Sequence, residues 1–231
     1  FHGDPGAELA VFSDGNHHMA LLDAVCAFRA HHDISNVFYT TTPPAPLVAA
    51  MRAGALLLGN LLLAVQPHVF ISPAFVLAPL QRDGFLGEAR RLFTSRGVDL
   101  LVPRADPRVR GIADLARSDV RLFLSNPEIE KASYAGYRTA LDAAAAMQGV
   151  DLAGVREGDD ARIVYGTRIH HREAPEAVAS GRADCAAVYH HLALRSTRMF
   201  PDLFDTISLD VPPTLEPAAS HIALVLSLIH I

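Results

Sequence analysis

The sequence predicts an α/β protein whose sheet is largely parallel. Short apolar runs rich in β-branched residues alternate with segments of helical periodicity, and the connections between them are short. A strand is followed directly by a helix at residues 9–30, 37–54 and 69–83, and no long array of hairpins occurs. Helices that join successive strands in this way are typical of parallel pairing.

The first strand–loop–helix unit carries most of the functional prediction. Leu9–Phe12 is an apolar run typical of a buried strand, Ser13–Asn16 is a cluster of turn residues, and apolar residues recur at helical spacing from Met19 onward. The first N–H groups of a helix have no partner inside it and lie at the positive end of its dipole. The loop Gly15–His18 is therefore predicted to be a natural position for an anion.

The second unit repeats this arrangement. Val37–Thr40 is rich in β-branched and aromatic residues, as strands are. Thr41–Pro44 combines a hydroxyl N-cap with prolines suited to a first helical turn, Ala45–Arg52 continues the helix, and Gly54 ends it. The apolar segment Leu56–Val65 is expected to form a small hairpin or a buried excursion around a central turn.

The rest of the chain continues the alternation of strands and helices. The remaining predicted strands are residues 69–71, 98–102, 120–124, 162–166 and 184–189, with one more in the tail 212–231. The remaining predicted helices are residues 72–82, 112–116, 133–147 and 173–180.

Composition favours a globular protein without a polyanionic partner. The chain has 231 residues, half of them apolar, and can bury one large core or two small ones. The net charge is -5 and the basic residues are scattered, so no nucleic-acid footprint is indicated. Cys26 and Cys185 are interpreted as two buried free thiols. The longest apolar stretch, Ile222–Ile231, is too short to cross a membrane.

The first residue bears on processing. Because the chain begins with Phe1 and not with Met, we expect either that a signal peptide has been removed or that the sequence is a fragment.

Five segments give the chain a resemblance to a known family. They are Asn16–Leu21, Ala45–Gly54, Pro67–Ser72, Asn126–Leu141 and Ala174–Tyr189. Their shared order and spacing resemble the type II periplasmic solute-binding proteins and, within them, the molybdate-binding family. The resemblance extends over most of the chain.

The resemblance implies two α/β lobes with mostly parallel sheets flanked by helices and a ligand cleft between the lobes. Lobe 1 would comprise residues 1–99 and 197–231, and lobe 2 residues 100–196. Such proteins are not enzymes and use no cofactor. They close around a small anion by a hinge motion and hand it to the permease of an ABC importer. A monomer in the periplasm or another extracytoplasmic location, free or lipid-anchored, is expected.

The resemblance also implies ligand-binding positions. Family members have a serine where this chain has Asn16, a serine-containing turn at Thr41–Pro44, backbone donors near Ser133 and a tyrosine hydroxyl at Tyr189. A tetrahedral dianion such as molybdate is held by hydroxyl and peptide N–H groups without a counter-charge. Asn16 fits a helix cap equally well. The ligand-binding residues predicted are Asn16, His17, His18, Thr41, Thr42, Ser72, Ala132, Ser133, Tyr189 and His190.

Adjacent histidine pairs leave the ligand open. They are His17-His18, His31-His32, His170-His171 and His190-His191. Neighbouring side chains point in different directions, so at most one member of each pair is expected to face a site. Neutral imidazoles suit a transition metal or a metal chelate, whereas protonated ones add positive charge for an anion. The pairs lack i, i+4 spacing, which favours loop and capping roles, and no metal site is predicted.

The sequence thus predicts an extracytoplasmic binding protein for a small molybdate-like or tungstate-like oxyanion. One alternative keeps the fold and changes the ligand to an organic carboxylate or a transition-metal species bound through histidines. Another is a metal-dependent enzyme that uses the histidine pairs. Hydrolase or transferase activity of the usual kinds is disfavoured because the sequence contains no G-x-S-x-G, P-loop or G-x-G-x-x-G motif.

Overall fold

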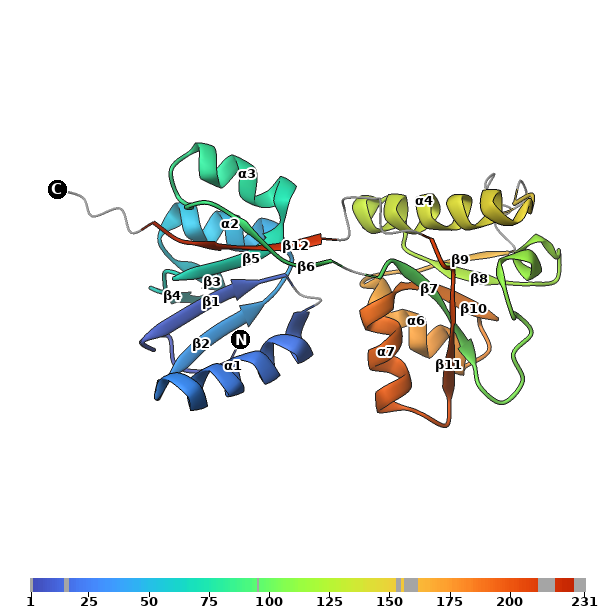
Figure 1. Cartoon of the computed structure of the whole chain (residues 1–231), viewed down its shortest axis with the longest axis horizontal. Coiled ribbons are helices and arrows are strands. Elements are labelled where there is room, and N and C mark those ends of the chain that lie inside the picture. Colours follow the sequence, from blue (N-terminus) through green and yellow to red (C-terminus); the bar gives the residue numbers. More distant parts are fainter. Residues whose placement is uncertain are drawn as a thin grey trace. The chain divides into compact units, whose positions relative to one another are not determined.

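The computed structural model describes residues 2–14, 17–94, 96–152, 155, 162–211 and 219–226. The chain forms two compact units, each with one five-stranded sheet and its own helices (Figure 1). Unit 1 comprises Phe1–Thr94 and Ala219–Ile231, and unit 2 comprises Ser95–Ala218. The predicted α/β fold class is confirmed.

The parallel strands of unit 1 end at one edge of its sheet. In sheet order the strands are β2 (Val37–Thr41), β1 (Leu9–Ser13), β5 (Val69–Pro73), β12 (Ala219–Leu224) and β6 (Arg90–Thr94). β1 pairs in parallel with β2 and with β5, whereas β12 is antiparallel to β5 and β6. Ser13 lies opposite Thr41 on β2 and Ile71 on β5, so the ends of these three strands are level.

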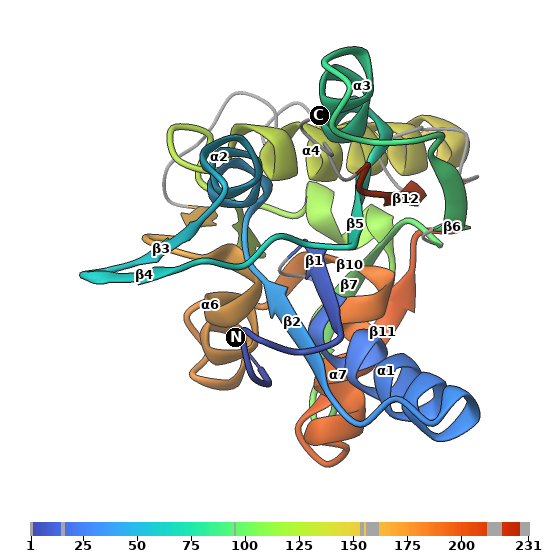
Figure 2. The same ribbon diagram turned by 90° about the vertical axis from the view of Figure 1, so that its left-hand side faces the viewer.

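Helices cover both faces of the unit 1 sheet. α2 (Pro44–Ala53) and α3 (Ala74–Arg82) lie on one face, and α1 (His18–His32) lies on the other (Figures 1 and 2). Side chains alternate along each strand, so neighbouring residues enter different cores. Phe12 packs in the core that contains Leu47 of α2, whereas Val11 packs in the core that contains Leu21 of α1.

A small hairpin projects from unit 1. β3 (Leu56–Leu58) and β4 (Leu61–Leu63) pair antiparallel and extend away from the sheet (Figure 2). Of the two forms that the sequence allowed for Leu56–Val65, a hairpin or a buried excursion, the structure shows the hairpin. Leu57, Leu61 and Leu62 on it are exposed.

Unit 2 has a second sheet with a comparable plan. In sheet order the strands are β11 (Phe204–Ser208), β7 (Val98–Pro103), β10 (Cys185–Tyr189), β8 (Leu122–Leu124) and β9 (Ile163–Tyr165). β10, β8 and β9 pair in parallel, and β7 is antiparallel to β10 and β11. β10 is almost entirely buried, as its small apolar residues allow.

The helices of unit 2 also pack into two cores. α4 (Lys131–Gln148) and the short 3-10 helix η2 (Ile112–Ala116) contribute to one core, in which Leu124 and Tyr137 are buried. α6 (His170–Ala179) and α7 (His190–Met199) contribute to the other, together with Phe123. Leu124 and Phe123 are adjacent on β8 and point to opposite faces of the sheet.

The largely parallel prediction needs one correction in each sheet. β12 in unit 1 and β7 in unit 2 run opposite to the other four strands. Both reversed strands are the first to follow a passage of the chain from one unit to the other.

The units divide the chain at residues 94/95 and 218/219, whereas the family resemblance implied boundaries at 99 and 197. The pairing of β7 with β11 accounts for the difference, because it holds both strands in one unit.

Two smaller expectations are also resolved. Cys26 and Cys185 are both free thiols; Cys185 is buried as predicted, but Cys26 is exposed on α1. In the part of the chain that the structure describes, no helix has both the length and the apolar character needed to cross a membrane.

Asp184 connects three segments of unit 2, its own and those of Arg108 and Arg121, by hydrogen bonds. Its Oδ1 accepts a hydrogen bond from the Arg108 guanidinium at 3.0 Å, and its Oδ2 accepts one from the backbone N–H of Arg121 at 2.7 Å. The side chain is only 7% exposed, so removing it leaves a donor without its partner in a dry position. The acidic residue that directly precedes β10 is therefore structural.

Replacing Asp184 with alanine is expected to lower the free energy of unfolding by about 2–4 kcal/mol, because a buried carboxylate and both of its hydrogen bonds are lost. Urea denaturation measures the change. Asp119→Ala is the matched control, since Asp119 pairs with Arg108 and Arg117 on an exposed surface and should matter little. Equal losses for the two variants would contradict a structural role specific to Asp184.

Candidate ligand-binding site

Unit 1 gathers polar side chains where its parallel strands end. Ser13 ends β1, Thr41 ends β2 and Ser72 is the second-last residue of β5. Each strand leads through a short connection to the next helix, so the N-termini of α1, α2 and α3 lie at this same edge. We call it the carboxyl edge of unit 1. In open α/β sheets, ligands bind at such edges.

Two buried hydroxyl groups at the carboxyl edge of unit 1 hold the loop that follows β1. The Ser72 hydroxyl donates to Oδ1 of Asp14 at 2.8 Å, and Ser13 Oγ lies 3.0 Å from Nδ1 of His17. The Asp14 N–H also donates to the Ile71 carbonyl at 3.2 Å. The predicted residues His17 and Ser72 are thus both at this edge, but the Ser72 hydroxyl hydrogen is already given to Asp14.

Thr41 and Thr42 provide further hydroxyl groups. Both are partly exposed, and neither hydroxyl bonds to another residue that the structure describes. The main chain of Thr42 is fixed, because its N–H donates to the Ser13 carbonyl at 3.1 Å. The neighbouring Thr40 Oγ1 is fully buried and has no hydrogen-bond partner within the described residues. The two predicted threonines are therefore available as donors.

The N-terminus of α2 differs from the prediction. A threonine hydroxyl was expected to cap it, but the N-cap is Pro43, which makes no side-chain hydrogen bond. Pro44 follows at the first helical position and, like Pro43, has no N–H group. α2 therefore offers fewer backbone donors to a ligand than α1 or α3 does.

Burial dominates the electrostatics of the loop after β1. It raises the pKa of Asp14 to about 6, and the hydrogen bond from Ser72 opposes this shift. Burial lowers the pKa of His17 to about 4. The His17 ring also packs edge-on against Phe93, with 5.2 Å between ring centroids. At neutral pH this loop therefore has an uncharged imidazole and an ionised carboxylate.

Unit 2 has a second polar edge at the ends of β8 and β10. Ser125 follows β8 and is fully buried, and its Oγ bonds to no residue in the described ranges. Tyr189 ends β10, and its hydroxyl is hydrogen-bonded to the Ser133 side chain on the first turn of α4. The predicted residues Ser133 and Tyr189 are thus brought together. Burial nevertheless raises the pKa of Tyr189, so its hydroxyl stays protonated.

α4 brings its N-terminus close to this tyrosine. A Cβ added at Gly136 would lie only 3.0 Å from the Tyr189 hydroxyl oxygen. The first intrahelical bond runs from the Tyr134 N–H to the Glu130 carbonyl at 3.0 Å, which leaves the N–H groups of residues 131–133 without an intrahelical acceptor. Backbone donors and the Tyr189–Ser133 pair therefore share one end of α4.

The N-terminus of α6 is already occupied by carboxylates of the chain itself. Glu173 accepts hydrogen bonds from the backbone N–H groups of residues 167, 168 and 169 at 2.7, 2.7 and 3.0 Å. Glu130 accepts one from the His170 N–H at 2.9 Å. Burial raises the pKa of Glu130, whereas the backbone donors lower the pKa of Glu173 despite its partial burial. α6 therefore offers no free N–H cluster to an external anion.

His190 is oriented by a buried carboxylate. Its Nδ1 lies 2.8 Å from Oδ2 of Asp99, and its backbone N–H donates to the Gly97 carbonyl at 2.9 Å. An imidazole held at Nδ1 in this way presents Nε2 as its second functional atom. Nε2 accepts a hydrogen bond or a metal when the ring is neutral and donates when the ring is protonated.

The remaining histidine pairs do not form a metal centre in the described part of the chain. His31 and His32 are exposed at the end of α1. His170 is buried between Phe123 and Tyr137, and burial lowers its pKa to about 4. Over the described ranges, no group of three or more His, Cys, Asp or Glu side chains is placed to hold a metal ion.

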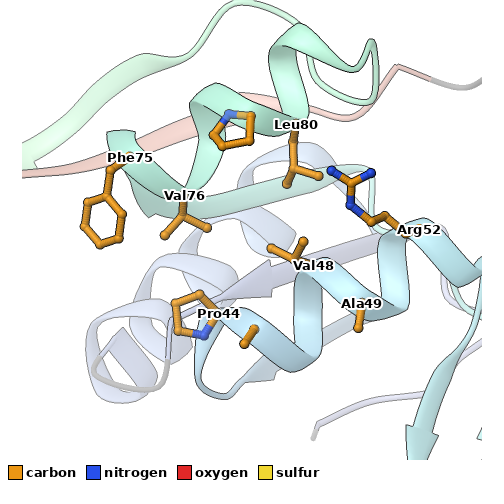
Figure 3. Close-up of a pocket in the computed structure, with 9 residues that line it drawn as sticks. Pro44, Val48, Ala49, Arg52, Phe75, Val76 and Leu80 are labelled. Carbon is orange, nitrogen blue, oxygen red and sulfur yellow. The ribbon is translucent and has the colours of Figure 1, made fainter. Parts of the chain in front are cut away.

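A groove lies between α2 and α3 and begins at their N-terminal residues Pro44 and Phe75, near the carboxyl edge of unit 1 (Figure 3). It has a volume of about 520 Å³, and Val48 of α2 and Val76 and Leu80 of α3 lie along it (Figure 3). Arg52 lies at one end of the groove, but its guanidinium is paired with Asp83. The groove is too apolar to satisfy the oxygens of an anion, so it is not the candidate site.

The predicted residues divide into three groups. His17, Thr41, Thr42 and Ser72 lie at the carboxyl edge of unit 1, and Ser133, Tyr189 and His190 lie near the ends of α4 and β10 in unit 2. Asn16 lies outside the described residues, and for His18 and Ala132 the structure describes the backbone alone. The sequence analysis did not single out Asp14, Asp99, Ser125 or Gly136, and Glu130, expected on a solvated face, instead accepts the His170 N–H. The sequence could have indicated Asp14 and Ser125, because each directly follows a predicted strand.

Comparisons with known proteins agree with this architecture. The family model described as bacterial extracellular solute-binding protein matches residues 9–223. A comparison with curated proteins found no match. Many solved structures share the fold, and three of them are described next.

The similar structures are all distant in sequence. A protein assigned as the substrate-binding domain of a molybdenum ABC transporter from Clostridium difficile is 17% identical, with a TM-score of 0.65 over 94% of this chain and 84% of that one. The periplasmic molybdate-binding protein of Azotobacter vinelandii is 21% identical, with a TM-score of 0.60 over 96% and 87%. Iron-bound HitA from Pseudomonas aeruginosa is 16% identical, with a TM-score of 0.61 over 96% and 76%. At these identities the likeness establishes the fold.

The Asp14→Asn variant is expected to show a pH dependence of stability that is cancelled in the native protein. There, Asp14 and His17 make contributions of opposite sign. Raising the Asp14 pKa from 3.8 to about 6 makes the native protein lose stability as pH rises between those values. Lowering the His17 pKa from 6.5 to about 4 makes it gain stability as pH rises between those values. Each contribution is at most about 3 kcal/mol, and the two have opposite signs.

Chemical denaturation from pH 4.5 to 7.5 tests this balance. The Asp14→Asn variant should become more stable as pH rises and exceed the native protein by about 1–3 kcal/mol at pH 7.5, because the uncompensated carboxylate is gone. His17→Gln should show the reverse slope. Parallel profiles for the native protein and both variants would refute the balance.

Proposed function

Because the chain belongs to the family of bacterial extracellular solute-binding proteins, we propose that it captures a small oxyanion and delivers it to the permease of an ABC importer. Molybdate and tungstate are the first candidates, since two proteins with the same fold carry a molybdenum or molybdate assignment. The proposed location is the periplasm or another extracytoplasmic space. The proposed role is binding without catalysis.

The hydrogen-bond donors at the carboxyl edge of unit 1 are the main support for the proposal. Thr41 and Thr42 present hydroxyl groups there, beside the N-termini of α1 and α3. Neutral hydroxyls and helix N–H groups bind an oxyanion well, because each donates a directed hydrogen bond and the helix dipole favours negative charge. No lysine or arginine follows β1, β2 or β5 directly among the described residues, so the donor set is neutral.

Unit 2 supplies donors of the same kind. Ser133 and the free N–H groups at the start of α4 lie beside the Tyr189 hydroxyl. We propose that the ligand takes hydrogen bonds from both units and that a hinge motion closes the protein on it. A ligand held by both units would favour the closed state over the open one.

One alternative keeps the binding role and changes the ligand. His190, oriented by Asp99, has the carboxylate–histidine arrangement that often supports metal binding, and iron-bound HitA shares the fold. A second alternative is an organic carboxylate, which would use the same neutral donors. The metal hypothesis is the weaker one, because the described residues contain no three-ligand cluster around His190.

Isothermal titration calorimetry with molybdate, tungstate, zinc and nickel separates these ligands. Oxyanion binding without added metal is expected. Thr42→Val and Tyr189→Phe should each weaken it about tenfold or more, since each removes one hydroxyl donor to a charged ligand. Thr139→Val, on an exposed face of α4, is the matched control and should leave affinity unchanged. Metal binding that weakens as pH falls, with no oxyanion binding, would replace the proposal with the histidine-based alternative.

Gly136→Ala is expected to weaken oxyanion binding without destabilising the protein. The added Cβ would lie 3.0 Å from the Tyr189 hydroxyl and push it away from its position beside Ser133. Alanine favours the helix by up to about 1 kcal/mol relative to glycine, which offsets the cost of displacing the Tyr189 hydroxyl, so thermal stability should change little. Titration calorimetry and thermal unfolding report the two effects separately. Unchanged affinity would show that the Tyr189 hydroxyl does not contact the ligand.

A further inference from the structure

Tyr189 lies at one end of a series of ring contacts within unit 2. Its ring centroid is 4.8 Å from that of Tyr137 on α4, with the two ring planes tilted by 44°. Tyr137 lies 4.7 Å from His170 at the start of α6, and His170 stacks on Phe123 of β8 at 5.3 Å. Tyr137, His170 and Phe123 are all fully buried. The series therefore connects the end of β10 to α4, α6 and β8.

Tyr137 also holds the main chain of Tyr189. Its hydroxyl is hydrogen-bonded to the backbone of Tyr189, in a position closed to solvent. Because a buried polar group that loses its partner costs free energy, this bond fixes the end of β10 against α4. Tyr137 thus contacts Tyr189 at two points, its ring and its backbone.

One face of α4 carries further contacts to the same tyrosine. Ser133, Gly136 and Tyr137 are spaced i, i+3 and i+4, so they lie on one side of the helix. The Ser133 side chain is hydrogen-bonded to the Tyr189 hydroxyl, and the lack of a side chain at Gly136 leaves room for that hydroxyl. Neighbouring positions on α4 therefore determine where both ends of the Tyr189 side chain lie.

His170 supports Tyr137 and is itself fixed at its backbone. Its N–H donates to Oε2 of Glu130, the N-cap of α4, at 2.9 Å, which ties the start of α6 to the start of α4. Burial lowers the pKa of His170 to about 4, so the ring is uncharged at neutral pH. An uncharged imidazole packs against its aromatic neighbours as another aromatic ring does. His170 therefore supports Tyr137 without bringing a charge into the core.

We propose that Tyr137 and His170 are positioning residues for the Tyr189 hydroxyl. A hydroxyl that is already held in its bound orientation loses less freedom when a ligand binds, so rigid support raises affinity without adding a contact. Tyr137 gives this support directly, and His170 gives it through Tyr137. The proposal rests on the proposed oxyanion function, in which Tyr189 is one of the donors.

Titration calorimetry with molybdate, tungstate, phosphate and sulfate tests the role of Tyr137. Tyr137→Phe removes only the hydroxyl that bonds to the Tyr189 backbone and is expected to weaken binding about threefold to tenfold. In a Tyr189→Phe background the same change should weaken binding by less than about twofold, because the group that Tyr137 positions is gone. Tyr134→Phe is the matched control. It removes a hydroxyl from the same helix, where the ring packs against Tyr165, and should leave affinity unchanged.

His170 is tested with variants of equal core damage. His170→Ala is expected to weaken binding about threefold or more, because the ring beside Tyr137 is lost. Val178→Ala, on the same helix, removes a buried side chain from the core that contains Phe123 but leaves the ring series intact. Both variants should lower the thermal unfolding temperature, and only His170→Ala should weaken binding. His170→Phe restores a flat aromatic ring and should recover most of the affinity.

Each outcome supports the proposal or overturns it. Losses of affinity in Tyr137→Phe and His170→Ala that vanish in the Tyr189→Phe background support it. Equal losses with and without the Tyr189 hydroxyl overturn it, since the two residues would then act on the site as a whole. Unchanged affinity in both variants overturns it and retains the oxyanion function. Failure of all four anions to bind the native protein overturns both.

Discussion

Parallel strands must be joined by crossover helices, and this constraint determines where polar chemistry gathers in both units. A helix that follows a parallel strand starts at the carboxyl edge of the sheet, with its unpaired N–H groups and positive dipole end at that edge. In unit 1 this applies to α1, α2 and α3, and in unit 2 to α4, α6 and α7. The hydroxyl and carboxyl side chains at these edges are partners for donors that the fold itself leaves free.

The two units satisfy those donors in different ways. In unit 2 the backbone N–H groups at the N-terminus of α6 donate to the carboxylates of Glu173 and Glu130. In unit 1 the α2 N-terminus has few donors to satisfy because Pro43 and Pro44 lack N–H groups. The donors that remain differ between the units: they are the N-termini of α1 and α3 with two threonines in unit 1, and the N-terminus of α4 with the Tyr189–Ser133 pair in unit 2.

Local patterns sufficed to predict most elements, and the exceptions have identifiable causes. β1, β2, β5 and β10 are apolar runs followed by turn or cap residues, and they were predicted within a residue or two. β6 was missed because all five of its residues are exposed, so it has no buried face to produce a periodicity. α7 was missed because it starts immediately after β10 without an N-cap residue, at His190. The reversed directions of β7 and β12 depend on pairings between distant segments, which no local pattern encodes.

The candidate site was harder to predict from local patterns than the fold was. Hydroxyl residues at strand ends could be identified from the sequence, and Thr41, Thr42 and Ser72 lie at the carboxyl edge of unit 1. Their roles could not be, because a hydroxyl is a ligand donor only if no internal acceptor takes its hydrogen. Ser72 gives its hydrogen to Asp14, a residue 58 positions away, and the Ser133 hydroxyl pairs with a tyrosine from another strand. Such pairings form only when the sheet assembles.

Two internal acids also lie at these edges. Asp14 and Glu130 are both partly buried with raised pKa values, and neither has a cationic partner among the described residues. A fold under selection for stability alone would replace such groups with neutral ones, because an unpaired carboxylate in a dry position costs free energy. Their presence near free helix N-termini means that the edges are not simply attractive to negative charge. Each edge combines hydrogen-bond donors with an acidic acceptor.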